Sequence, residues 1–287
     1  MDKVITLKDA SNKFIDYLKS QKRASATILA YGNDIAQLVK FIGEKSVTSL
    51  SDVNSSLLDD FKASLEKNGY IAKSVSRKIN SIKTFFRFLK TEGYIDSDPA
   101  AAVTHPKYEV KPPRILSKLE YRALRDACRS DARISAIVEL MLQTGIRIGE
   151  VANLNLDDIK EAEIHIKPFE SHEERNIPLN KAAKEALDRY LAERPKVKEK
   201  AIFVTKTGRP FLIRNIRSSI ERYFEIAGIK DAKVNDLRHT WVFHHLAAGT
   251  PLVVISKLAG HKRLSTTEKY LKLIGEKKEG AIKLEEL

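Results

Sequence analysis

The chain has 287 residues, 43% of them hydrophobic, which is enough for two domains with apolar cores. Its 51 lysines and arginines exceed its 38 acidic residues, and the net charge of +13 favours nucleic acid as a partner, ahead of an anionic membrane. One cysteine excludes an intramolecular disulfide, no apolar run reaches the roughly 20 residues that span a bilayer, and no signal peptide is visible, so we expect a cytoplasmic protein.

Amphipathic helices are expected throughout the first hundred residues. Apolar residues recur there at spacings of three and four in four segments, and the last three segments close near Gly43, Gly69 and Gly93. The segments cover residues 6–22, 25–43, 54–69 and 74–93. We therefore predict a four-helix domain over residues 1–104. This domain and the rest of the chain both carry excess positive charge, which suits a protein that grips DNA from two sides.

Residues 105–117, HPKYEVKPPRILS, form the predicted boundary between two domains. Three prolines, two of them adjacent, favour an extended linker. Beyond it, residues 118–287 combine helical periodicity with short alternating segments. Helices are predicted at residues 117–129, 132–145, 213–228, 235–249, 251–260 and 265–274, and strands at residues 163–167, 175–180 and 201–205. The predicted fold class is therefore mainly α with a small antiparallel β-sheet, in two domains.

Two arginines, a histidine and a tyrosine in this second part point to phosphate chemistry. Arg147 follows the predicted end of a helix, Arg238 lies in NDLRHTW, and His261 precedes Tyr270 by nine residues in HKRLSTTEKY. An arginine presents a rigid fork of donors that matches phosphate oxygens and keeps its charge. A tyrosine hydroxyl is a possible covalent nucleophile, so these four residues together suit an enzyme that attacks a phosphodiester.

Tyr270 lies early in a predicted C-terminal helix. Ser265 as N-cap and Glu268 three residues later would form a capping box at the start of that helix. Most tyrosines only pack, and ionising a free tyrosine at neutral pH costs roughly 4 kcal/mol. A reactive Tyr270 therefore needs help from neighbouring charges or from a base.

The segments TGIRIGEVANLNLDDI and LRHTWVFHHLAAGTPLVVISKLAGHKRLSTTEKYL, with the spacing between them, resemble the tyrosine recombinase (integrase) family. SATILAYGNDIAQLVKFI and SVSRKINSIKTFFRFLKTEGYIDSDPAAAV resemble the helical, SAM-like core-binding domain of that family. The match covers nearly the whole chain and is most similar to the short Xer type, its archaeal members included. It implies a core-binding bundle over residues 1–104 and a catalytic domain over residues 118–287.

This resemblance implies strand exchange in DNA without a metal ion, ATP or another cofactor. A tyrosine attacks a phosphodiester, forms a 3′-phosphotyrosyl link and frees a 5′-hydroxyl, which then attacks the link of a partner strand. It also implies double-stranded DNA with inverted half-sites, bound by dimers that recombine as a tetramer. The implied roles are nucleophile for Tyr270, phosphate ligands for Arg147, Arg238 and His261, and supporting residues for Glu150 and His239.

Two positions depart from the family pattern. The family usually has a proton-transferring histidine where this chain has Asn235, which can hydrogen-bond but cannot titrate. The family's hairpin lysine, which protonates the leaving 5′-oxygen, would fall on Glu170 when counted back from Arg175. We therefore take Lys167, on the first strand, as the general acid, with His172 as the second candidate.

Further predictions concern basic residues of the first domain and apolar residues of the tail. Four basic residues of the fourth predicted helix are either DNA-phosphate ligands or a solvated face: Lys73, Arg77, Lys78 and Lys83. In the tail over residues 275–287, Ile282, Leu284 and Leu287 are expected to dock into a neighbouring subunit.

Three functions remain open from the sequence. The leading one is a site-specific recombinase for dimer resolution, plasmid maintenance or integration of a mobile element. A catalytically silent DNA-binding protein is supported by Asn235 and the displaced lysine. A type IB topoisomerase-like enzyme would share the chemistry but would relax a single duplex.

Overall fold

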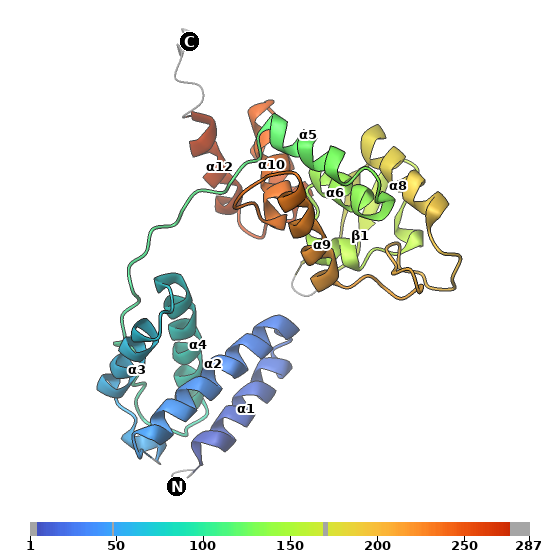
Figure 1. The fold of residues 1–287 in the computed structure, drawn as a ribbon. Helices are drawn as coiled ribbons and strands as arrows, with labels where there is room; N and C mark the ends of the chain where they lie inside the picture. Colours follow the sequence, from blue (N-terminus) through green and yellow to red (C-terminus); the bar gives the residue numbers. More distant parts are fainter. Residues whose placement is uncertain (1–4, 48, 169–171, 276–287) are drawn as a thin grey trace. The chain divides into compact units, whose positions relative to one another are not determined.

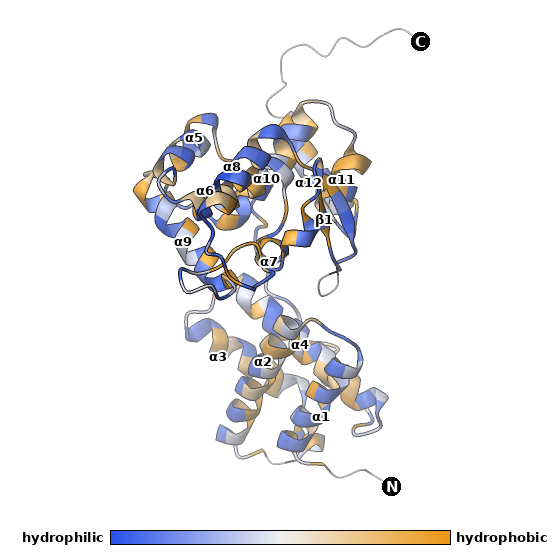
Figure 2. Cartoon of the chain, turned by 90° about the vertical axis from the view of Figure 1, so that its right-hand side faces the viewer, coloured by the Kyte–Doolittle hydropathy of each residue, from blue (hydrophilic) through white to orange (hydrophobic). Residues whose placement is uncertain are grey.

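The computed structural model describes residues 5–47, 49–168 and 172–275. The chain divides into two compact units, Met1–Val110 and Lys111–Leu287 (Figure 1). The division falls within the predicted linker, where residues 103–117 form neither helix nor strand. In both units the helices carry hydrophobic and hydrophilic residues on different faces (Figure 2). Across the described residues, no helix has the length and apolarity that crossing a bilayer would require.

Four helices form the N-terminal unit, as predicted. They are α1 (Leu7–Ser20), α2 (Ser25–Glu44), α3 (Ser55–Lys67) and α4 (Ala72–Thr91), with a 3-10 turn, η1 (Leu50–Asp52), before α3. Fully buried aromatic rings hold them together, and Phe14 of α1 meets Phe85 of α4 edge to face at 5.3 Å. Helix α2 ends at Glu44, near Gly43 as predicted, and the left-handed turn that follows it falls on Ser46 (φ 59°).

The second unit is mostly helical around a single hairpin. Its elements are α5 (Lys118–Ala127), α6 (Ala132–Thr144), α7 (Ile148–Ala152), η2 (Leu156–Asp158), β1 (Glu163–Ile166), β2 (Arg175–Pro178), α8 (Lys181–Glu193), α9 (Ile213–Ile226), α10 (Val234–Ala247), α11 (Leu252–Ala259) and α12 (Ser265–Gly275). The strands β1 and β2 pair antiparallel, with Glu163 opposite Pro178 and Ile166 opposite Arg175. Helix α6 is buried along most of its length and forms the centre of the core.

Two elements of this unit differ from what the sequence predicted. Residues 201–205 do not form a third strand, because Ala201 and Val204 make only isolated bridges, to Asn155 and Pro210. Their apolar side chains are buried as a strand's would be, but the chain turns back at once through a Thr205 N–H to Arg209 carbonyl bond of 2.7 Å. Helix α8 was missed because three of the first six residues in its sequence KAAKEALDRYLAE are alanines, which give a weak apolar pattern.

Candidate active site

Arg147 owes its position to a glycine. Gly145 ends α6 in the left-handed conformation (φ 64°), and a Cβ there would lie 2.2 Å from the Trp241 ring, so only glycine fits. Arg147 then begins α7 as its N-cap, and its guanidinium donates to the Gly260 carbonyl at 2.6 Å. The half-buried Arg147 side chain is thereby fixed between the ends of two helices.

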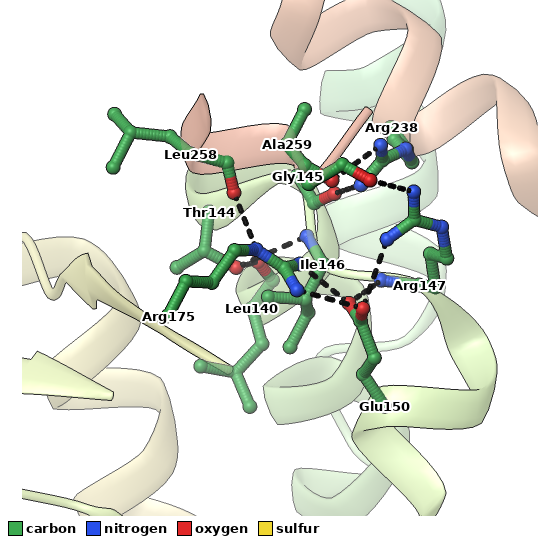
Figure 3. A network of polar contacts seen from close by, with 11 residues as sticks. Leu140, Thr144, Gly145, Ile146, Arg147, Glu150, Arg175, Arg238, Leu258 and Ala259 are labelled. Atoms are coloured by element: carbon green, nitrogen blue, oxygen red, sulfur yellow. Dashed lines mark hydrogen bonds and ion pairs between the residues drawn. The ribbon is translucent and has the colours of Figure 1, made fainter. Parts of the chain in front are cut away.

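Glu150 is the carboxylate around which the arginines gather. It is 3% exposed and accepts the backbone N–H of Arg147 at 2.8 Å and the Arg147 guanidinium at 2.9 Å. Arg175 donates two more bonds to it, at 2.9 and 2.7 Å, and Figure 3 shows the two arginines reaching Glu150 from opposite sides. Burial alone would raise the pKa of Glu150, but the bonds and charges of Arg175 and Arg147 outweigh it and hold that pKa at about 2.

Arg175 was not among the predicted site residues. Its side chain is 8% exposed and also donates to the Leu258 carbonyl at 2.7 Å, linking β2 to α11. A Cβ on Gly260 would lie 3.0 Å from this guanidinium, a tight contact, and Gly260 also takes the left-handed conformation (φ 63°) that favours glycine. The available signal was alternation: Arg175 shares a strand face with the buried Ile177.

Arg238 is almost completely buried, at 3% exposure. Its guanidinium donates to the Gly145 carbonyl and, at 2.7 Å, to the Ala259 carbonyl (Figure 3). Burial and the charge of Arg147 lower the pKa of Arg238 to about 9, so the side chain is still charged at neutral pH. Arg147 and Arg175 bind Glu150 directly, and Arg238 interacts with it only through its charge. The surplus positive charge of the three guanidinium groups suits a bound phosphate.

His261 follows the left-handed Gly260 at the end of α11. Its Nδ1 lies 2.7 Å from the Thr267 hydroxyl, and burial with the charges of Arg238 and Arg147 lowers its pKa to about 3. The imidazole is therefore neutral near pH 7. When Nδ1 accepts the hydroxyl of Thr267, Nε2 carries the hydrogen and is a donor for a phosphate oxygen.

Tyr270 is 3% exposed and packs in a small cluster with Trp241, Leu246 and Ile255. Burial raises its pKa to about 12, although Arg238 acts in the opposite direction. Ionising the hydroxyl at pH 7 would therefore cost about 7 kcal/mol in this arrangement. The predicted capping box is wrong: Ser265 is already the first residue of α12, and the Leu264 carbonyl accepts from the Glu268 N–H at 3.0 Å.

His239 and Asn235 complete the surroundings of the tyrosine. The Nδ1 atom of His239 lies 2.5 Å from the Tyr270 hydroxyl, and its Nε2 lies 2.8 Å from Nδ2 of Asn235. The sequence predicted a supporting role for His239 but not this contact with the hydroxyl.

The predicted general acid, Lys167, pairs with another carboxylate. Its ammonium lies 2.6 Å from Asp158, whose side chain is buried, and its own side chain is half exposed. Burial lowers the pKa of His172, and the nearby positive charge of Arg147 lowers it further. Glu170 lies outside the described residues. Both Lys167 and His172 therefore remain candidates for protonating a leaving group.

Three of the four basic residues predicted on α4 have partners within the N-terminal unit. Arg77 and Lys78 pair with the buried Asp34, and Lys83 donates to the Ala101 carbonyl at 3.2 Å. Lys78 is 7% exposed, which contradicts its prediction as a DNA contact; it is an internal ion pair. Lys73 is exposed. Within the described ranges, no three His, Cys, Asp or Glu side chains gather as metal ligands would.

Comparisons with known proteins match both units. The phage integrase family matches residues 114–276, and the N-terminal SAM-like domain of phage integrases matches residues 12–93. The tyrosine recombinase XerC of Thermodesulfovibrio yellowstonii is 32% identical over 90% of this chain and 89% of its own length. A lambda integrase dimer bound to a COC′ core site has a TM-score of 0.77 at 19% identity, covering 99% of this chain and 81% of that one. A lambda integrase tetramer bound to a Holliday junction has a TM-score of 0.75 at 20% identity, covering 90% of this chain and 78% of that one. These matches confirm the predicted fold class.

Proposed function

Because the chain belongs to the phage integrase family of tyrosine recombinases, we propose that it cleaves and rejoins DNA at specific sites through Tyr270. One observation supports these particular residues as the active site. Arg147, Arg238 and His261 lie close enough for their charges to interact, and they form a positively charged site beside Tyr270. Preorganised donors of this kind stabilise the charge that develops on phosphate oxygens, each by about 100- to 1000-fold in rate. We expect the protein to act in the cytoplasm, on chromosomal, plasmid or mobile-element DNA.

The chemistry conserves the energy of the broken bond. The Tyr270 oxygen attacks the phosphorus, the 5′-oxygen leaves with its electron pair, and a 3′-phosphotyrosyl link replaces the phosphodiester. A 5′-hydroxyl from the partner strand later reverses this step, so no ATP is needed. Arg147 and Arg238 bind the non-bridging oxygens, and His261 donates a further hydrogen bond from Nε2. Glu150 and Arg175 keep Arg147 in place without touching the substrate.

The proposal is tested by covalent trapping. Nicked duplex fragments of chromosomal DNA are incubated with the protein in EDTA, and SDS-resistant adducts are collected and sequenced. We expect adducts at a restricted set of sites. Failure of every duplex to form an adduct, despite measurable DNA binding, would contradict the proposal and favour the catalytically silent DNA-binding protein.

We expect Lys167→Ala to slow cleavage of an ordinary duplex about 100-fold, because the leaving 5′-oxygen then lacks its proton donor. A duplex with sulfur in place of the bridging 5′-oxygen should restore the rate, since a thiol has a pKa near 8.5 and leaves as the thiolate. Single-turnover cleavage of both duplexes is the measurement, with Lys160→Ala, at an exposed position three residues before β1, as control. Cleavage of the ordinary duplex by Lys167→Ala at the parental rate would make His172 the candidate instead.

Relaxation of supercoils separates recombination from the topoisomerase alternative. We propose that cleavage is confined to specific sites, as the family assignment favours. Relaxation of plasmids irrespective of their sequence would instead support a type IB topoisomerase-like activity.

Assembly is proposed from the sequence of the tail and from the solved relatives, which were captured as a dimer and a tetramer on DNA. We propose that this chain binds inverted half-sites as a dimer and recombines as a tetramer. Residues Ile282, Leu284 and Leu287 lie outside the described residues. Truncation after Gly275 is expected to leave DNA affinity within about twofold and to reduce recombination about tenfold or more, by loss of subunit docking. Gel-shift and recombination assays measure these two effects, and equal recombination by the shortened chain would contradict the docking role.

A further inference from the structure

His239 connects the nucleophile to Asn235. Helix α10 places Asn235 and His239 one turn apart on the same face, and α12 brings the Tyr270 hydroxyl against the other edge of the imidazole. The three side chains form one line of contacts, with 2.8 Å between Asn235 Nδ2 and His239 Nε2 and 2.5 Å between His239 Nδ1 and the Tyr270 oxygen. Both ring nitrogens are therefore engaged.

The charges around His239 keep its ring neutral. Burial, and then the adjacent Arg238, lower the pKa of His239 to about 4. Tyr270 faces it from α12, and His261, beyond the end of α11, is close enough for their charges to interact. At neutral pH one ring nitrogen therefore carries a hydrogen and the other has a lone pair that can accept one.

We propose that His239 exchanges the hydroxyl proton of Tyr270 during cleavage and rejoining, and that Asn235 positions the imidazole ring for this exchange. The inference rests on the proposed function and names a catalytic group within it. Other side chains near the hydroxyl are less suited. Arg238 cannot accept a proton, and Asn235 reaches the tyrosine only through His239.

The amide of Asn235 supports both states of the ring. Turned by half a rotation about its last bond, it presents Oδ1 to Nε2–H, which leaves the lone pair of Nδ1 facing the tyrosine. The Tyr270 proton then moves to Nδ1 as the tyrosine oxygen bonds to phosphorus. The 5′-oxygen leaves with the electron pair of the broken bond and takes a proton from Lys167. The imidazolium that forms is held by the Asn235 oxygen, as asparagine holds histidine in cysteine proteases. Rejoining reverses each transfer.

The test uses the nicked duplex recovered by covalent trapping and the full-length chain. His239→Gln keeps hydrogen-bonding groups but cannot take a proton, so single-turnover cleavage is expected to fall about 100-fold, with DNA affinity within twofold of the parent. His245→Gln, on the same helix and in a tilted ring contact with Trp241, is the matched control and should cleave at the parental rate. Sulfur in place of the 5′-oxygen should not restore His239→Gln, in contrast to Lys167→Ala.

Chemical rescue separates proton transfer from packing. Imidazole added to His239→Ala is expected to raise cleavage at least tenfold, with a pH dependence that follows neutral imidazole. Asn235→Ala should show a smaller loss than His239→Gln. Cleavage by His239→Gln within threefold of the parent, or no response of His239→Ala to imidazole, would overturn the inference while the parental adduct still supports the proposed function. Absence of any adduct from the parent would instead overturn the proposed function, and this inference with it.

Discussion

Tyr270→Phe is expected to abolish covalent adducts with DNA completely while leaving the fold and DNA binding intact. The substitution removes only the attacking oxygen and keeps the ring that packs against Trp241 and Leu246. The buried hydroxyl is hydrogen-bonded to His239, and the loss of this bond should cost the variant about 1 kcal/mol of unfolding free energy. Adduct yield and affinity for a nicked duplex are measured side by side.

Tyr223→Phe is the matched control for this prediction. Tyr223 lies on α9 in the same unit, is 7% exposed, and its hydroxyl makes a long contact of 3.4 Å to Asp131. This control should form adducts at the parental level. Residual adduct from Tyr270→Phe would mean that another residue attacks the DNA.

Glu150→Gln is expected to destabilise the second unit by about 3–5 kcal/mol. The amide has nearly the shape of the carboxylate but no charge, and its NH2 group would face donors of Arg147 and Arg175. Arg175 is 8% exposed, so it would be left as an uncompensated buried cation. Urea unfolding measures the loss, and Glu185→Gln on the exposed face of α8 should change the unfolding free energy by less than about 0.5 kcal/mol.

The same carboxylate predicts acid sensitivity. The folded pKa of Glu150, about 2, is below its ordinary value of 4.5, so its contribution is fully present above pH 4.5 and is lost as pH falls toward 2. A shift of that size corresponds to about 3 kcal/mol. The parent should lose this stability between pH 4.5 and 2, whereas Glu150→Gln should not. Equal acid sensitivity of the two proteins would contradict the role of Glu150.

The sequence predicted those parts of the fold that depend on local pattern. The four N-terminal helices follow their apolar spacing, and Gly145 and Gly260 end helices because each takes a left-handed conformation. Apolar spacing did not indicate α8, because its alanines differ too little in hydrophobicity from the polar residues around them. Residues 201–204 are buried as the residues of a strand would be. A buried segment does not have to pair with a neighbouring strand, however, and these residues make only isolated bridges.

The predicted site was less complete because its contacts join distant parts of the chain. Spacing and resemblance indicated Arg147, Arg238 and Tyr270, which lie within short motifs. Arg175 binds Glu150 from 25 residues away, and although alternation places Arg175 on the same strand face as the buried Ile177, nothing in the local sequence identifies Glu150 as its partner. The local sequence of Lys78 likewise indicates a surface cation, because its partner Asp34 lies 44 residues away in the chain.

The sequence motifs did not predict that the nucleophile is buried. At 3% exposure, and with a pKa of about 12, Tyr270 is a poor nucleophile in this arrangement. A phosphate bound by Arg147 and Arg238 supplies the electrophile, and a base at His239 reduces the cost of removing the proton. The account thus assigns reactivity to the bound complex, in which both are present.

The most direct test of the account is to identify the bond in the trapped adduct. Adducts formed in EDTA are digested with trypsin and nuclease, and mass spectrometry identifies the residue and the DNA end that are joined. We predict that the peptide containing Tyr270 carries a 3′-phosphate end and that the released strand has a 5′-hydroxyl. A nucleotide on any other residue, or a link to a 5′-phosphate, would contradict the account.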